Sequence, residues 1–128
     1  MAYVITLTAE DIEFGERFTN ELKRVRFLYR GVLWLFDEDS DDWKLIVATE
    51  VVDRAGPRDT YVRLTSVAKQ LNANSFQMLR ISAMSPRQPI YAALQSVFGS
   101  ASSVWGARLR NTVVNGLRIA EAYLYEVK

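Results

Sequence analysis

The sequence predicts a single α+β domain over residues 1–128: a mostly antiparallel sheet of about five to six strands backed by about three helices. Two observations lead to this prediction. Segments with helical spacing of apolar residues alternate with short apolar runs typical of strands. The last segment also carries Asn115-Gly116 between two apolar residues, a strong signal for a β-hairpin. Hairpins mixed with helices are typical of α+β domains.

A short strand and a helix are expected first. Residues 2–7 are mainly apolar and partly β-branched, which favours a strand. Thr8 predicts a helix N-cap, and Asp11 stands where the second residue of a capping box belongs. Apolar residues then recur at near-helical spacing as far as Tyr29. We therefore expect a helix over about 9–28, ending before Gly31.

A hairpin and a second helix follow. Two apolar runs, 32–36 and 43–49, flank the acidic segment 37–42 and predict two largely buried strands. Next comes a charged loop, 53–59, that contains Gly56-Pro57, and proline suits the first turn of a helix. The second helix is expected over about 58–71, before Asn72.

The third part is predicted to be strand, helix and hairpin. Residues 76–84 indicate a strand, a proline-containing break follows, and 90–98 indicate a short helix that stops at Gly99. Residues 99–106 are the most flexible internal segment by composition. The two strands of the C-terminal hairpin come last.

A two-residue turn at Asn115-Gly116 fixes the register of this hairpin. Arg110 then faces Glu121, and Arg108 faces Tyr123, both favourable cross-strand pairs. The face that holds these pairs comprises Arg108, Arg110, Thr112, Val114, Leu117, Ile119, Glu121, Tyr123 and Tyr125. The opposite face is small and apolar toward its far end, which suits a covering helix.

Composition narrows the possible functions. The chain has no cysteine and no histidine, which excludes disulfides, nearly all zinc enzymes and nucleophile pairs based on histidine. No apolar run approaches the ~18 residues of a membrane span, and none suits a secretory signal. We expect a cytoplasmic protein without membrane contact, and we assign no catalytic residue, metal ligand or cofactor.

Charge is distributed unevenly along the chain. Residues 1–64 hold thirteen acidic against nine basic side chains, whereas residues 65–128 hold two against seven. No acidic residue occurs between Asp59 and Glu121, and twelve of the sixteen basic residues are arginine. Such a dipolar chain presents different surfaces to anions and cations.

The first candidate site is the set Arg108, Arg110, Tyr123 and Tyr125 on the hairpin. Arginine and tyrosine on an open sheet suit either a protein interface or single-stranded nucleic acid. The structural alternative is that Arg110 pairs with Glu121 while the tyrosines pack at the edge of the core.

The second candidate site is Arg54 and Arg58, which flank Gly56-Pro57 and could clamp an anion at a helix N-terminus. The alternative is that they pair with Asp53 and Asp59 in the same loop. The acidic segment 37–42 opens like a calcium loop but lacks the required glycine and glutamate. It suits a solvated hairpin tip, with weak cation binding left open.

Together these observations predict a non-catalytic binding or interaction domain. It would act through protein–protein contacts, as a homo-oligomer or as an accessory subunit of an assembly. The alternative is a nucleic-acid-binding module that uses the acid-poor C-terminal half. A small enzyme without histidine or cysteine is the third possibility.

Overall fold

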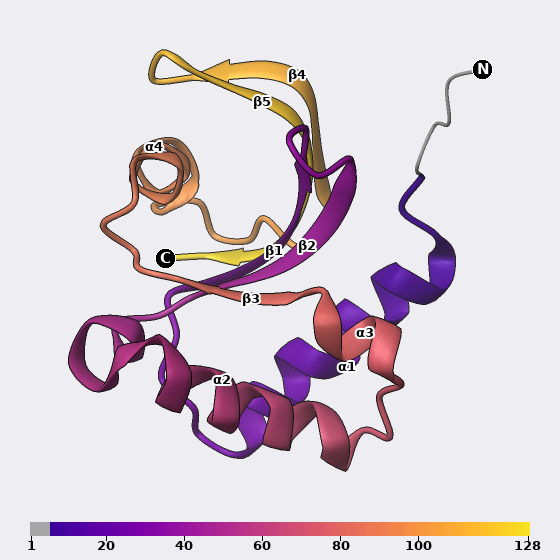
Figure 1. Cartoon of the computed structure of the whole chain (residues 1–128). Helices are drawn as coiled ribbons and strands as arrows, with labels where there is room; N and C mark the ends of the chain where they lie inside the picture. The colour runs from indigo at the N-terminus through magenta and orange to yellow at the C-terminus, as the bar shows by residue number, and fades with distance from the viewer. Residues whose placement is uncertain (1–5) are drawn as a thin grey trace.

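The computed structural model of the chain describes residues 6–128, which form a five-stranded sheet with helices on both faces (Figure 1). The elements are α1 (Ala9–Arg24), β1 (Gly31–Asp37), β2 (Asp42–Ala48), α2 (Val51–Gln70), α3 (Ser75–Leu79), β3 (Ile81–Met84), α4 (Pro89–Phe98), β4 (Ala107–Val114) and β5 (Leu117–Val127). The α+β class is therefore confirmed, with four helices among the described residues rather than about three.

The sheet has the strand order β3-β2-β1-β5-β4. Three of its four pairings are antiparallel, but β3 runs parallel to β2 after the crossover through α2. The sheet is thus mixed, and the expectation of a mostly antiparallel sheet is wrong. The reason lies in the connection, because a helix between two neighbouring strands returns the chain in the same direction.

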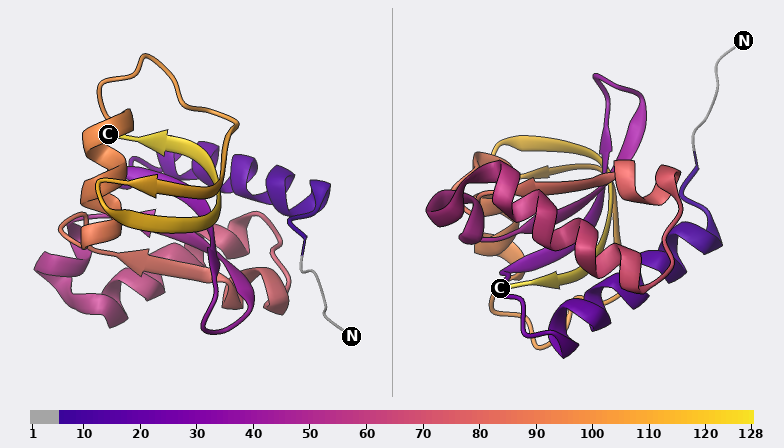
Figure 2. Two further views of the ribbon diagram at one scale, coloured as in Figure 1. Left: turned by 90° about the horizontal axis from the view of Figure 1, so that it is seen from above. Right: turned by 60° about the horizontal axis from the view of Figure 1, so that its bottom comes forward.

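Two apolar clusters lie on opposite faces of the sheet. Helices α1 and α2 cover one face, where Phe18, Trp34 and Leu45 are fully buried. Helix α4 covers part of the other face, where Tyr91 and Leu124 are fully buried. Figure 2 shows α4 on the opposite side of the strands from α1 and α2. None of the helices in residues 6–128 has the combined length and apolarity that crossing a membrane requires.

Helix α1 begins as predicted and ends earlier. Thr8 and Asp11 form the expected capping box. The helix stops at Arg24, not near residue 28, because Arg26 adopts a left-handed conformation with φ 60°. The amides of Arg26 and Phe27 then bond back to the carbonyls of Lys23 and Leu22, as in a Schellman motif. Arginine is not the usual residue at such a position, so no residue type there indicated the end of the helix.

Helix α2 starts at Val51, before the segment 53–59 that was predicted as a charged loop, and so includes that segment. The first turn reaches Gly56, where φ of 85° and ψ of 164° break the helix, and Pro57 begins the longer part. Glycine tolerates this backbone conformation, and proline needs no donor partner in a first turn. Asn72, with φ 57°, follows the end of the helix as expected.

One strand prediction is only partly correct, and another lies mostly outside the described residues. The segment 76–84 divides into helix α3 and strand β3, because Asn74 and Gln77 form a capping box that starts a helix. Of the predicted strand 2–7, residues 2–5 lie outside the described part of the chain, and Thr6 and Leu7 are not in a strand.

The C-terminal hairpin has the predicted register, with Arg110 opposite Glu121 and Arg108 opposite Tyr123. Its faces do not alternate regularly along its whole length, because Asn111 has φ 44°. Beyond that point the hairpin bends over α4 (Figure 1). Val114, Leu117 and Ile119, expected beside the arginines, pack instead in the cluster under α4.

Candidate interaction surface

Tyr125 marks the inner limit of the predicted arginine–tyrosine face. It is only 1% exposed, and its hydroxyl donates a hydrogen bond to the Ile12 carbonyl at 2.6 Å. The indole N–H of Trp34 donates to the same hydroxyl at 3.1 Å. Burial raises the pKa of the Tyr125 phenol. Tyr125 therefore belongs to the core, as the structural alternative proposed, and its side chain is not available to a partner.

Two further aromatic rings stack outward from Tyr125. The Tyr123 ring lies 5.3 Å away and the Trp105 ring 5.2 Å away, both in edge-to-face geometry. Tyr123 is half-buried, while Trp105 is 38% exposed. Edge-to-face pairs are favourable beyond the area they bury. The core ring thus holds the two outer rings in fixed positions.

Cations lie next to these outer rings. The Arg108 guanidinium is 5.3 Å from the centre of the Tyr123 ring, and the Lys23 ammonium is 5.4 Å from Trp105. Arg110 is exposed on the same strand. It lies opposite Glu121, but no ion pair within residues 6–128 joins the two, so that part of the alternative fails.

We call Trp105, Arg108, Arg110 and Tyr123 the tryptophan–arginine surface. It lies at the edge of the sheet, where α1 packs on β1 and β5 and leaves most of β4 exposed (Figure 1). Trp105 was not predicted to belong to this surface, because side chains that alternate regularly along the strand would place it on the opposite face of the hairpin. The turn at Gly106, with φ 87°, redirects the chain just before β4 and brings Trp105 to the same side as Tyr123.

A hollow of about 390 Å³ adjoins this surface between the end of α1, the loop before β4 and the end of β5. Glu126 lies in it and forms ion pairs with Lys23 and Lys128. Burial alone would raise the pKa of the Glu126 carboxyl, but hydrogen bonds and charge from the two lysines outweigh it and lower the pKa. The charged side chains that line the hollow are thus paired with one another.

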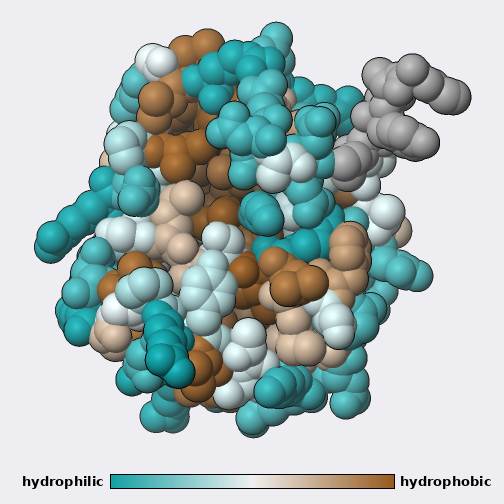
Figure 3. All heavy atoms as spheres, in the orientation of Figure 1, coloured by the Kyte–Doolittle hydropathy of each residue, from teal (hydrophilic) through white to brown (hydrophobic). Residues whose placement is uncertain are grey.

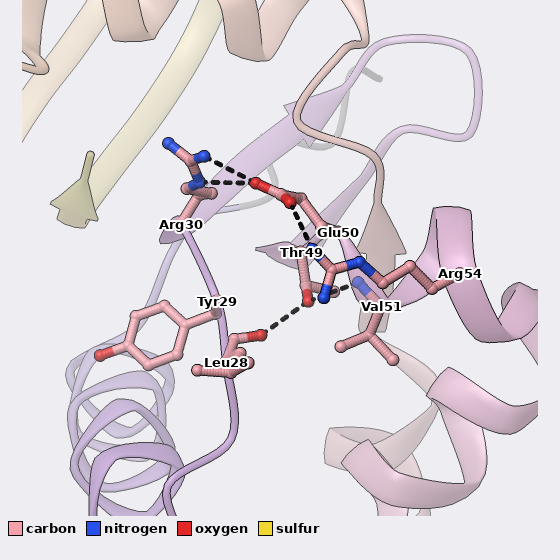
Figure 4. A pocket seen from close by; sticks show the side chains of 7 residues that line it. All are labelled: Leu28, Tyr29, Arg30, Thr49, Glu50, Val51 and Arg54. Atoms are coloured by element: carbon pink, nitrogen blue, oxygen red, sulfur yellow. Dashed lines mark hydrogen bonds and ion pairs between the residues drawn. The ribbon is translucent and has the colours of Figure 1, made fainter.

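The second predicted site is divided by the structure. Arg54 donates to Glu50 at 3.2 Å in a cleft that also holds Arg30 (Figure 4). Arg58 is exposed and does not line this cleft. Arg30 and Glu50 were not predicted to lie beside Arg54, since both are outside the charged segment 53–59.

The expected pairing within segment 53–59 is also absent. Asp59 pairs with Arg63, one turn along α2, at 3.0 Å. Asp53 accepts a hydrogen bond from Ser85 at 2.9 Å. Both acids are therefore satisfied by residues outside the segment, because α2 begins earlier than predicted and turns them away from the arginines.

An apolar groove of about 420 Å³ lies on the sheet face that α4 only partly covers. Its floor includes Leu35, Ile46 and Ile119, and Figure 3 shows brown, apolar side chains gathered in a hollow beside α4. Arg118 and Glu38 form an ion pair of 2.6 Å at its rim. Glu38 belongs to the acidic hairpin tip, and no group of three acidic side chains within residues 6–128 could hold a metal ion.

Arg80 is the least expected charged residue. Its side chain is 4% exposed, forms an ion pair of 2.8 Å with Asp11, and donates to the Trp43 carbonyl at 3.2 Å. The guanidinium also lies 4.8 Å from the Trp34 ring and 4.7 Å from the Phe76 ring. These contacts join α1, α3 and the sheet, so we assign Arg80 a structural role.

Comparison with known proteins adds no functional information. No protein-family model matches the chain, and neither the curated proteins nor the solved structures give a significant match.

Proposed function

We propose that this chain is a non-catalytic binding domain that acts through protein–protein contacts, as a homo-oligomer or as an accessory subunit of an assembly. The observation that supports this most is the tryptophan–arginine surface, in which exposed aromatic and arginine side chains are held by a buried tyrosine. Tryptophan, tyrosine and arginine are the residues that most often dominate binding energy at interfaces.

Preorganisation is the second argument. Trp105 and Tyr123 stack on a ring that two hydrogen bonds fix, and Arg108 lies over Tyr123. Side chains already held in one conformation lose little entropy on binding. Exposed aromatic rings in a rigid arrangement therefore suit a specific contact better than flexible side chains would. A cytoplasmic location is part of the proposal and accords with the absence of cysteine from the sequence.

Light scattering of the purified protein tests self-association. A homo-oligomer would give a mass above the 14.6 kDa of the monomer. Arg108→Glu should return the mass to that of the monomer and leave the melting temperature almost unchanged, because the side chain is exposed. Arg63→Glu is the control, since it makes the same change of charge on helix α2 and not on strand β4.

If the wild type is monomeric, the test moves to a different partner. The tagged chain is purified from its own cells in three forms: wild type, Arg108→Glu and the Arg63→Glu control. A partner captured by the wild type and the control, and lost with Arg108→Glu, would support the proposal. A partner retained by Arg108→Glu would refute the role of this surface.

Retention on immobilised single-stranded DNA or RNA distinguishes the nucleic-acid alternative from the protein-contact proposal. Arg108 and Arg110 are exposed cations beside aromatic rings, which is the observation that favours this alternative. Binding that falls steeply as salt rises, and that is lost in Arg108→Glu, would replace the protein-contact proposal.

A further inference from the structure

A second region with unbalanced charge lies far from the tryptophan–arginine surface in the sequence. It is formed by the segment before β1, the start of α2, the loop before α4 and α4 itself. Two neighbouring hollows, of about 200 and 300 Å³, share Arg30 and Glu50. The first hollow is also lined by Leu28, Tyr29, Thr49, Val51 and Arg54, and the second by Pro86, Arg87 and Gln95. We call the two together the arginine cleft.

Three guanidinium groups and one carboxylate line the arginine cleft. Arg30 donates two hydrogen bonds to one oxygen of Glu50, at 2.9 and 2.7 Å, and Arg54 donates to the other oxygen at 3.2 Å (Figure 4). Arg87 is exposed and joins no carboxylate within residues 6–128. Three positive charges against one negative charge leave two positive charges that no lining residue balances.

Hydrogen bonds fix the backbone of the cleft. The Thr49 hydroxyl donates to the Leu28 carbonyl at 2.7 Å and accepts from the Val51 amide at 3.1 Å. The Arg30 amide donates to the Ala48 carbonyl at 2.7 Å. Glu50 in turn orients two of the guanidinium groups. A site held in this way can bind a ligand without first paying a large ordering cost.

One wall of the cleft is apolar. Leu28 is 72% exposed, although it is a large aliphatic side chain, and Val51 lies across the same hollow. Apolar side chains next to fixed charges are typical of small-molecule sites, which usually have volumes of about 300–1,000 Å³. The larger of the two hollows, at about 300 Å³, is at the lower end of that range.

We propose that the arginine cleft binds a small phosphate monoester, with its dianionic phosphate held by Arg54, Arg30 and Arg87. The organic part would lie on Leu28 and Val51. Two unbalanced positive charges match a phosphate dianion, and the planar guanidinium group is suited to binding phosphate oxygens through paired hydrogen bonds. This site is separate from the tryptophan–arginine surface and does not depend on the proposed protein contacts.

The test is a titration of the full chain followed by amide chemical shifts in ¹H–¹⁵N NMR spectra, at about 0.1 M salt, where exposed charges are partly screened. Three probes are used: inorganic phosphate, phenyl phosphate and uncharged phenol. We expect saturable shifts for phenyl phosphate at Glu50, Val51 and the neighbouring residues. Inorganic phosphate should bind at least about fivefold more weakly, since it lacks the apolar part, and phenol should not saturate.

Three variants locate the site. Arg54→Gln and Arg87→Gln should each weaken phenyl phosphate binding about tenfold or more, because each removes one charged donor. Arg58→Gln is the matched control, since it removes an exposed arginine from α2 that does not line the cleft. It should change the affinity by less than about twofold, in keeping with screening of a distant exposed charge.

Several results would overturn the proposal. Binding that does not saturate, or shifts that centre on Arg108 and Arg110, would mean general attraction to positive charge. An equal loss of affinity for phenyl phosphate in Arg58→Gln and Arg54→Gln would also indicate general attraction to positive charge. Equal affinity for phosphate and phenyl phosphate would show that the apolar wall holds no organic group.

Discussion

Replacing Arg80 with methionine tests whether the buried ion pair stabilises the fold. Methionine keeps much of the apolar volume of the side chain but removes the guanidinium. Asp11, whose side chain is 14% exposed, then loses its partner at 2.8 Å, and the Trp43 carbonyl loses a donor at 3.2 Å. Removing one member of a buried ion pair typically costs about 3–5 kcal/mol, because the other charge stays behind without compensation.

We expect a loss at the low end of that range, about 3 kcal/mol. Asp11 keeps a hydrogen bond from the Thr8 amide and some contact with water, which limits the penalty. A domain of this size has about 5–15 kcal/mol of stability, so the variant should still fold. The melting temperature should fall by roughly 10–15 °C.

Urea denaturation followed by tryptophan fluorescence measures this change. Arg63→Met is the control, because its pair with Asp59 is exposed and should contribute less than about 0.5 kcal/mol. The double variant Asp11→Asn/Arg80→Met should lose less than the sum of the two single variants, since it removes both members of the 2.8 Å pair and leaves only the more exposed Asp42, 3.8 Å from Arg80, without its cation. A loss below about 1 kcal/mol in Arg80→Met would refute the structural role assigned to Arg80.

Four further predictions concern packing and pH. Gly15→Ala should destabilise the fold by about 1–3 kcal/mol, because the added carbon would overlap the Tyr125 ring, and unchanged stability in a melting experiment would mean that the ring can move aside. The pKa of Glu126 is lower in the folded state than its usual 4.5. The stability that this carboxylate contributes is therefore complete above that pH and is lost as the pH falls below it. In Glu126→Gln, the free energy of unfolding should depend less on pH in this acidic range. Burial raises the pKa of Tyr29 and Tyr125 above 10, so stability should fall as the pH rises beyond about 10, because only the unfolded chain releases these protons there. The chain has no histidine, so no side chain has an ordinary pKa between about pH 5.5 and 7.5. The free energy of unfolding from urea denaturation should therefore change by less than about 1 kcal/mol across that range.

Local signals in the sequence predicted the local structure well. The Thr8 capping box, the acidic hairpin and the register around Asn115-Gly116 are all confirmed, because each depends on a few neighbouring residues. The short helix α3 was missed, although Asn74 and Gln77 carry the same kind of capping signal. There the apolar run 76–84 favoured a strand, because the spacing of apolar residues over so few positions fits a strand as well as a single helical turn.

Long-range features were less accessible. Strict alternation on the last hairpin predicted two clean faces, but the left-handed Asn111 bends the strand and transfers Ile119 to the other cluster. The sequence named Arg108 and Tyr123 for the surface, and their cross-strand pairing is confirmed. It could not show that Tyr125 is covered by α1, because that contact joins residues distant in the chain. The grouping of Arg30 with Arg54 could not be predicted for the same reason.

The central position of β1, between β2 and β5, has a consequence for how the chain reaches this structure. The hydrogen bond between Trp34 and Tyr125 joins residues 91 positions apart, so β1 gains its second neighbour long after it has paired with β2. In that interval the apolar strand β1 is an unpaired edge strand, and strands of other chains could pair with it. The carboxylates of segment 37–42 lie directly after that strand and repel copies of themselves. We therefore expect the acidic tip to oppose aggregation of the nascent sheet, a role that requires no bound cation.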